Sequence, residues 1–255
     1  VGLCLVVALG LVIGVNFAND YSDGVRGTDD HRVGPQRLVG SGAAAPGRVR
    51  AAAFCCFGVS GLAGLAAVAA TGHWWLLAVG VACVLAAWFY TGGRHPYGYL
   101  GLGEVFVLIF FGLVATAGTD YLLCGRVSAA GWVAAVAMGL TADGVLVTNN
   151  LRDIASDTAA GKRTLETRLG DRASRLLYAG LVVAVAVCCV LVAALSTWWA
   201  LLGLLGVALL VPAARTILGG AVGLRLVSTL RSTSMGELVL SLGLLAGVAV
   251  ARLTA

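Results

Sequence analysis

"VGLCLVVALGLVIGVNFANDYSDGVRGTDD", residues 1–30, is the stretch that decides the fold class, because an uncharged apolar run passes directly into a cluster of aspartates. The first fifteen residues carry no charge, whereas the next fifteen contain four aspartates and Arg26. A helix needs about 20 mostly apolar residues to cross a bilayer. The stretch therefore predicts a membrane helix with carboxylates at the end where it leaves the apolar phase.

The composition of the whole chain indicates a membrane protein. Of its 255 residues, 60% are hydrophobic and 11% are charged, and the mean hydropathy is +0.96. Soluble domains carry about 25% charged residues. We therefore predict an all-α, polytopic transmembrane bundle in the lipid bilayer, whose 36 glycines let helices pack closely. Eight spans are predicted, at residues 1–18, 50–71, 73–91, 102–123, 128–148, 174–195, 197–214 and 235–253.

The positive charges divide unequally between the two sides of such a bundle. If eight spans alternate in direction, one side receives residues 19–49, 92–101, 149–173 and 215–234 with the adjoining helix ends, and it holds 15 of the 17 lysines and arginines. Because positive loops mark the cytoplasmic face, we predict that this side faces the cytoplasm at the cell membrane. The net charge of +5 then reflects topology and gives no reason to expect nucleic acid as a partner.

Two segments on the predicted cytoplasmic side place amide and carboxylate side chains at helical spacing. Asn19 precedes Asp23 by four residues, and Asn149, Asp153 and Asp157 follow one another at intervals of four. Residues four apart share a helix face, where two like charges repel each other unless a cation lies between them. Mg²⁺ suits this arrangement, because it binds through a few carboxylates and leaves its other positions to water and phosphate oxygens.

Basic residues accompany the second segment, which reads "NLRDIASDTAAGKRTL" at residues 150–165. Arg152, Lys162 and Arg163 could bind the outer charges of a diphosphate. One acidic and basic segment on a membrane protein is usually a solvated surface. Two such segments on one side, where apolar runs end, predict a site for a ligand with a charged head and a long apolar tail.

A third segment on the same side, "YTGGRHPYGYLGLGE" at residues 90–104, combines five glycines with tyrosines and a carboxylate. The glycines let backbone approach a flat ligand, and Tyr90, Tyr97 and Tyr99 could stack on an aromatic ring or donate hydrogen bonds to it. Glu104 begins an apolar span, where an ionisable group is a functional candidate. Anchoring at the membrane interface is the alternative for the tyrosines. We predict an aromatic-substrate site in this segment.

The motifs "NDYSD" (19–23) and "NNLRDIASDTAAGKRTL" (149–165) resemble the paired aspartate motifs of the UbiA superfamily of intramembrane prenyltransferases. Residues 16–39 and 90–122 resemble, within it, the branch that prenylates 1,4-dihydroxy-2-naphthoate in menaquinone synthesis. The resemblance implies a helical bundle around a central cavity that opens to the membrane, with Mg²⁺ as the cofactor. It implies polyprenyl diphosphate and 1,4-dihydroxy-2-naphthoate as substrates, and demethylmenaquinol as the product after loss of CO₂.

The resemblance also assigns individual residues. The third position of the first motif falls on Gly27, so a carboxylate after a short insertion, Asp29 or Asp30, would replace it. The implied catalytic residues are Asp23, Asp153 and Asp157, and the implied metal ligands are Asn19, Asp20, Asp23, Asp29, Asp153 and Asp157. The implied diphosphate contacts are Arg152, Lys162, Arg163 and Arg94, and the implied aromatic-substrate contacts are Tyr90, Tyr97, Tyr99, Glu104, Asn149 and Asn150.

Members of this branch have nine spanning helices, so the resemblance predicts that residues 1–255 form a single domain lacking the first helix. Three other functions are alternatives. A different UbiA-type acceptor, such as 4-hydroxybenzoate, a tetrapyrrole or a sugar phosphate, is opposed by the match at residues 90–104. A transporter would carry charge and repeats within its spans, and a purely structural scaffold would not need two matched aspartate motifs.

Overall fold

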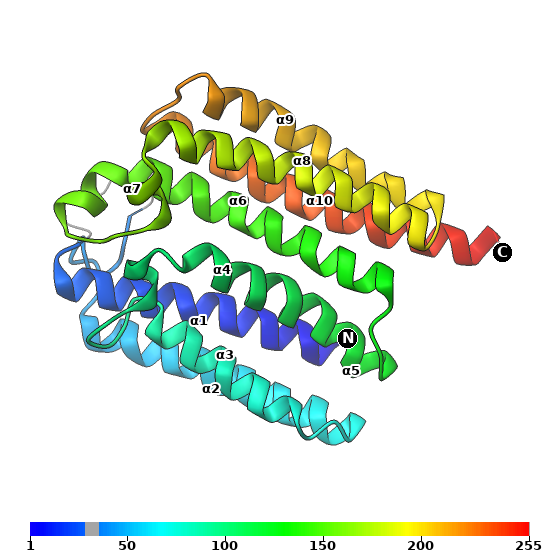
Figure 1. The fold of residues 1–255 in the computed structure, drawn as a ribbon. Helices are drawn as coiled ribbons and strands as arrows, with labels where there is room; N and C mark the ends of the chain where they lie inside the picture. The colour runs from blue at the N-terminus through cyan, green and yellow to red at the C-terminus, as the bar shows by residue number, and fades with distance from the viewer. Residues whose placement is uncertain (29–35, 255) are drawn as a thin grey trace.

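The computed structural model describes residues 1–28 and 36–254, and within these ranges every regular element is helical. Figure 1 shows the long helices lying side by side, with their connections gathered at the two ends of the bundle. The N-terminus and the C-terminus lie toward the same end, whereas the short helix α7 (Leu165–Leu169) lies at the opposite end. The predicted all-helical class is confirmed.

Seven helical segments of the described chain are long and apolar enough to cross a membrane, which makes this a multi-pass membrane protein. They are α1 (Gly2–Arg26), α2 (Pro46–Thr71), the segment Gly103–Cys124, α6 (Ala129–Ala159), α8 (Asp171–Leu195), the segment Trp198–Leu218 and α10 (Leu224–Thr254). The third segment joins α4 (Gly103–Val107) and α5 (Gly118–Cys124) through a π-helical stretch, Leu108–Ala117. The sixth joins a 3₁₀ turn, Trp198–Gly203, to α9 (Leu204–Leu218).

The predicted span at 73–91 is shorter than expected. Its helix, α3 (Leu76–Phe89), has 14 residues, and a helix rises only about 1.5 Å per residue, so α3 is shorter than a hydrocarbon core of about 30 Å. Trp74 and Trp75 before it and Tyr90 and Thr91 after it lie in turns, and these turns take up both ends of the predicted span. The expectation of eight full-length spans is therefore corrected to seven and a short apolar helix within the described residues.

The described acidic motifs lie on helices, which continue beyond the predicted ends of their spans at residues 18 and 148. Helix α1 continues to Arg26 and ends at Gly27, whose φ of 72° is the left-handed conformation that suits glycine. Helix α6 continues to Ala159, eleven residues beyond the predicted end of its span. Outside the apolar phase, a helix with polar side chains keeps the same backbone hydrogen bonds, so it need not end where its apolar run ends. The aspartates are consequently held by the same rigid helices that cross the membrane.

The buried core consists of two packed groups of helices. Helices α6, α8, α9 and α10 enclose Tyr178, Leu210, Ile217 and Leu240, whereas α1 and α2 enclose Ala18, Ala53 and Phe57 against α3. In Figure 1, α1, α2 and α3 lie on one side of the segment that begins at α4, and α6 to α10 lie on the other.

Glycines make the closest helix contacts of the bundle. A methyl group added at Gly206 of α9 would lie 2.5 Å from the carbonyl oxygen of Gly236 of α10, and one added at Gly112 would lie 2.7 Å from the carbonyl oxygen of Ala135 on α6. Neither distance is compatible with a side chain. At these positions glycine allows the close helix approach that the sequence predicts.

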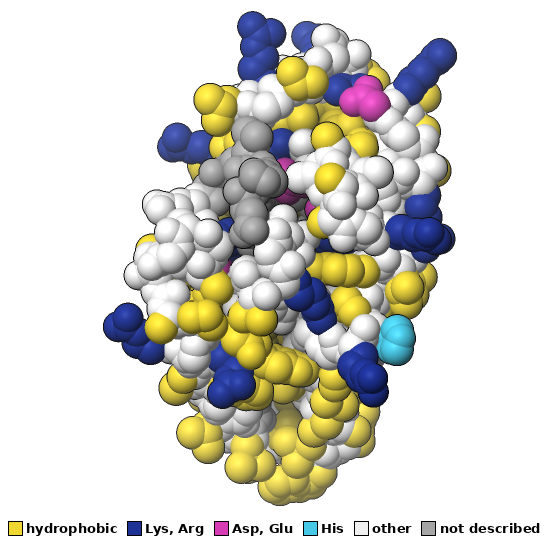
Figure 2. All heavy atoms as spheres, turned by 90° about the vertical axis from the view of Figure 1, so that its left-hand side faces the viewer, with side chains coloured by type: hydrophobic (Ala, Val, Ile, Leu, Met, Phe, Trp, Pro, Cys, Tyr) yellow, Lys and Arg dark blue, Asp and Glu magenta, His cyan; other side chains and the backbone are white. Residues whose placement is uncertain are grey.

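The described connections that follow α1, α3, α6 and α9 all lie at one end of the bundle, which faces the viewer in Figure 2. Many Lys and Arg side chains lie on this face, and Asp and Glu side chains are visible toward its centre. The end of the molecule that carries the acidic motifs is thus also the end where the sequence predicts the excess of positive charge.

Candidate active site

A cavity of about 390 Å³ lies between the two groups of helices. Helix α1 lines it with one face, because the contributing residues recur every three or four positions. They are Ala8, Leu11, Val12, Val15, Asn16, Asn19 and Asp23. This stripe is apolar where α1 lies deep in the bundle and becomes polar toward the end that carries the connections.

Helix α6 lines the opposite wall with a matching stripe. Its contributing residues are Ala142, Val145, Leu146, Asn149, Asn150, Asp153, Ser156 and Asp157. The deep part of the cavity is further lined by aromatic side chains of the segment Gly103–Cys124, namely Phe106, Phe110 and Phe111. The cavity therefore has a polar, acidic mouth and an apolar interior. One wall of it is helix α1, whose apolar run passes into Asn19 and Asp23.

Asp23 is buried and is held by a tyrosine. The Tyr99 hydroxyl donates a hydrogen bond of 2.8 Å to Asp23 Oδ1, and the Thr28 hydroxyl lies 3.3 Å from the same tyrosine oxygen. Burial, together with the charge of Asp23, raises the pKa of Tyr99 to about 12, so this hydroxyl remains protonated and serves as a donor near neutral pH. One turn earlier, the amide oxygen of Asn19 accepts a hydrogen bond of 2.9 Å from Thr91.

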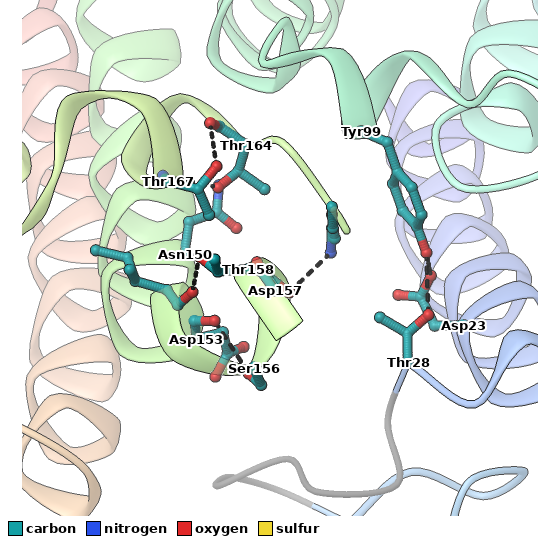
Figure 3. Close-up of polar contacts among 12 residues, drawn as sticks. Asp23, Thr28, Tyr99, Asn150, Asp153, Ser156, Asp157, Thr158, Thr164 and Thr167 are labelled. Carbon is teal, nitrogen blue, oxygen red and sulfur yellow. Dashed lines mark hydrogen bonds and ion pairs between the residues drawn. The ribbon is translucent and has the colours of Figure 1, made fainter. Parts of the chain in front are cut away.

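The acidic residues of α6 are accompanied by basic side chains. Lys162 Nζ lies 3.7 Å from Asp157 Oδ1, and 5.3 Å from the centre of the Tyr99 ring. Asp153 accepts two hydrogen bonds from its neighbour Arg152, of 2.7 and 2.6 Å. Lys162 and Tyr99 thus link the α6 side of the mouth to Asp23 on the α1 side, and Figure 3 shows the two sides facing each other.

The two acidic sides stay apart from each other. Within residues 1–28 and 36–254, no group of three or more His, Cys, Asp or Glu side chains is close enough to hold one metal ion. A metal at this mouth would therefore be bound by one or two carboxylates and would complete its shell with ligand oxygens and water, which is the mode that Mg²⁺ favours. The donors facing the cavity are carboxylate and amide oxygens, so their chemistry fits Mg²⁺.

Comparison with known sequences agrees with this architecture. A profile of the UbiA prenyltransferase family matches residues 1–222. The chain belongs to this family. It is 48% identical over 252 residues to the 1,4-dihydroxy-2-naphthoate octaprenyltransferase of Mycobacterium tuberculosis, covering 99% of this chain and 86% of that protein. The protein of the same name from Mycobacterium leprae is 51% identical, and the match covers 93% of this chain and 80% of that protein. The one from Escherichia coli is 37% identical, and the match covers 96% of this chain and 82% of that protein.

In this UbiA family member, the cavity gathers residues from all three predicted motif segments. Those among the predicted site residues that line it are Asn19, Asp23, Asp153, Asp157, Lys162, Tyr90, Tyr97, Asn149 and Asn150. They come from α1, α6 and the two connections that follow α3 and α6. The sequence placed them up to 143 positions apart, and the fold brings them to one mouth.

Several predicted residues have other places. Asp20 does not line the cavity, because its carboxylate turns to the next connection and accepts hydrogen bonds of 2.8 and 2.9 Å from the backbone of Leu38 and Val39. Arg94 and Arg163 are exposed to solvent outside the cavity lining. Three predicted residues lie just behind the lining, because they do not line the cavity themselves but bond to residues that do: Arg152 to Asp153, Tyr99 to Asp23 and Glu104 to Asn150. Asp29 and its alternative Asp30 lie outside the described residues.

The glycines of residues 90–104 also serve a different purpose from the one predicted. A methyl group at Gly98 would lie 2.6 Å from the backbone oxygen of Tyr90, and one at Gly92 would lie 2.4 Å from that of Trp88. These glycines let the connection fold against its own preceding helix. They position Tyr90 and Tyr97 at the cavity and do not themselves form its lining.

The lining residues that were not predicted include the polar side chains of Thr28, Arg37, Thr91 and Glu237. Glu237 carried a usable signal, because an ionisable side chain just inside an apolar span is a functional candidate. Arg37 comes from the connection that Asp20 anchors, and Thr91 bonds to Asn19. Arg37 lies in residues 16–39 and Thr91 in residues 90–104, but neither was assigned a role there, so only the three-dimensional structure reveals them.

Proposed function

We propose that this chain transfers a polyprenyl group from polyprenyl diphosphate to 1,4-dihydroxy-2-naphthoate, with Mg²⁺, to give demethylmenaquinol. The observation that carries the proposal is the polarity of the cavity, whose acidic mouth leads into an apolar interior. That form fits a ligand with a diphosphate head and a hydrocarbon tail. The acceptor is taken from the names of the relatives that cover nearly the whole chain.

The residues at the mouth would share the work of binding the diphosphate. Asp23 on α1 would hold one Mg²⁺ ion against the phosphate oxygens, and Asp153 with Asp157 on α6 would hold another, while Lys162 would contribute a charge-assisted hydrogen bond. When bound, Mg²⁺ supplies neutralisation of the diphosphate charge, which makes it a better leaving group. Tyr99 and Arg152, just behind the lining, would keep the carboxylates in position.

The apolar interior would protect the reactive carbon. Breaking the allylic C–O bond of the donor leaves a prenyl cation, which water would convert to an alcohol. Phe106 and Tyr97, stacked with ring centres 4.0 Å apart, present aromatic surface to the cavity and would stabilise a cation. The naphthoate ring would attack through the carbon that bears its carboxylate, and loss of CO₂ would then restore aromaticity.

The orientation proposed for the protein places the mouth at the cytoplasmic side of the cell membrane. The four connections at the charged end carry, with the neighbouring helix ends, 15 of the 17 lysines and arginines, and an excess of positive charge favours the cytoplasm. A soluble naphthoate would then enter from the cytoplasm, and the prenyl tail would remain in the bilayer.

The test is product identification with competing acceptors. Membranes containing the chain would be incubated with octaprenyl diphosphate, Mg²⁺, and equal amounts of 1,4-dihydroxy-2-naphthoate and 4-hydroxybenzoate, and the extracted lipids identified by mass spectrometry. We expect octaprenyl demethylmenaquinol as the product. A prenylated hydroxybenzoate as the main product would show a different acceptor within the family, and no prenylated product would contradict the proposal.

A further inference from the structure

One wall of the cavity has an unusual helical form. Residues Leu108–Ala117 form a π-helix, in which each backbone hydrogen bond spans five residues instead of four. Such helices are rare, occur mostly as single turns, and frequently mark functional sites. Here the stretch is ten residues long and lies within a membrane-spanning segment. A form that is both rare and extended indicates that the cavity depends on it.

The π-helical form determines which side chains face the cavity. Along α1 and α6 the lining residues recur at intervals of three and four, as on any α-helix. In the segment Gly103–Cys124 they recur at intervals of four and five. They are Phe106, Val107, Phe110, Phe111 and Ala115. An α-helix continuing from Phe106 and Phe110 would turn Leu113 and Val114 to the same face, but neither is among the described residues that line the cavity. The wider turn thus gathers three phenylalanines and Ala115 on one face.

This phenylalanine face begins at the reactive end of the cavity. Phe106 stacks on Tyr97 with ring centres 4.0 Å apart, and Phe110 stacks on Phe106 with ring centres 5.9 Å apart. The α10 wall of the same cavity instead presents the polar side chains of Ser234 and Glu237. Because hydrocarbon gains more from aromatic than from polar surface, a prenyl tail would follow the phenylalanine face.

The phenylalanine face ends deep in the bundle, at a small side chain. Gly112 lies against Gly139 of α6, where a methyl group added to Gly112 would lie 2.7 Å from the Cα atom of Gly139. Gly139 precedes Asp153 by fourteen residues on the same helix, which is a rise of about 21 Å. Ala115 lies farther along the segment than Gly112, lines the cavity and is exposed. Open space therefore remains in front of its methyl group at this depth.

We propose that the phenylalanine face is the track of the prenyl tail, and that the small side chain of Ala115 admits donors with many isoprenoid units. This inference rests on the proposed function, which places the diphosphate at the mouth and the tail in the interior. Two isoprenoid units are shorter than the distance from Asp153 to Gly112, so the tail of geranyl diphosphate ends before Ala115. Eight extended units are longer than this distance, so the tail of octaprenyl diphosphate passes Ala115. Ala115 is therefore a residue that determines which donors are accepted.

Ala115→Phe fills the space that the longer tail would occupy. We expect kcat/KM for octaprenyl diphosphate to fall about five- to a hundredfold, as for overpacking of an apolar site. The value for geranyl diphosphate should stay close to that of the wild type, because its tail does not reach the new ring. Geranyl diphosphate would be measured as a donor and also as an inhibitor of octaprenyl transfer, so its affinity is obtained even if it is transferred slowly.

Val114→Phe is the matched control, because it adds the same ring one residue earlier, at a position outside the described lining. It should leave the ratio of kcat/KM for the two donors unchanged. The pair of variants also tests the helical form itself, since an α-helix would place Val114 on the cavity face and Ala115 away from it. If Ala115→Phe does not fold, Ala115→Leu adds a smaller side chain at the same point and should lower the same ratio to a lesser extent.

Three outcomes would overturn the proposal. They are an unchanged ratio of the two donors in the Ala115 variants, an equal loss for both donors, or a selective loss of octaprenyl diphosphate in Val114→Phe. Failure of the proposed function is a separate result, because then the wild type itself would not prenylate the naphthoate with either donor.

Discussion

Tyr99→Phe is the most informative single substitution at the mouth, because it removes one oxygen and keeps the ring. The lost hydroxyl group donates a 2.8 Å hydrogen bond to Asp23, which is 5% exposed. Loss of a partner that orients a metal ligand typically costs about 10- to 100-fold in metal affinity or activity. Tyr99 is only partly buried, and Thr28 lies close enough to take over as donor. We therefore expect the lower end of that range, about a tenfold rise in the Mg²⁺ concentration that gives half-maximal activity.

The assay is an Mg²⁺ activation curve of prenyl transfer at a fixed concentration of prenyl diphosphate. Tyr97→Phe is the matched control, because its hydroxyl group donates to the backbone oxygen of Ala86 and does not touch an acidic residue. The control should lose some stability but keep the wild-type Mg²⁺ requirement. An unchanged Mg²⁺ requirement in Tyr99→Phe, or an equal rise in both variants, would refute the view that Tyr99 orients Asp23 for the metal.

Four further substitutions test other contacts of the site. Asp23→Asn and Asp153→Asn should each abolish turnover while the protein remains folded in membranes, because each removes charge from a different side of the mouth; near-normal turnover of either variant at saturating Mg²⁺ would argue against two-sided binding. Lys162→Ala should raise the KM for prenyl diphosphate about ten- to a hundredfold, as for a lost charge-assisted hydrogen bond, and steady-state kinetics in which the naphthoate KM shifts more would reverse the assignment. Asp20→Ala should lower the free energy of unfolding by about 1.5–3 kcal/mol through loss of two bonds to backbone N–H groups, with an unaltered Mg²⁺ requirement; a shifted requirement would restore Asp20 as a metal ligand.

The membrane class and the two acidic motifs could be predicted because both depend on local patterns. A run such as Val1–Val15 has only one stable environment, and the spacing of Asp153 and Asp157 fixes their common helix face. Helix ends were less predictable. Hydropathy falls where a helix leaves the lipid, but the backbone continues unchanged, so α1 and α6 extend beyond their apolar runs to Arg26 and Ala159.

The contacts between distant segments could not be predicted from one sequence. Nothing local distinguishes Asp20, which anchors the backbone of Leu38 and Val39, from Asp23, which faces the cavity, except their positions on the helix circumference. The choice between them depends on how α1 packs. In the same way Glu166 gives no signal in sequence, because its burial follows from how α7 packs against α6 and α8.

The central claim is that one cavity couples loss of diphosphate from a prenyl donor to loss of CO₂ from the naphthoate. The most direct measurement uses the purified chain in lipid nanodiscs with octaprenyl diphosphate and carboxyl-labelled 1,4-dihydroxy-2-naphthoate, and it counts labelled CO₂, diphosphate and prenylated product together. We predict equal amounts of all three with Mg²⁺, and none of them when EDTA removes it. Prenylated product that retains its label, or diphosphate released at the same rate without the naphthoate or with EDTA, would contradict the account.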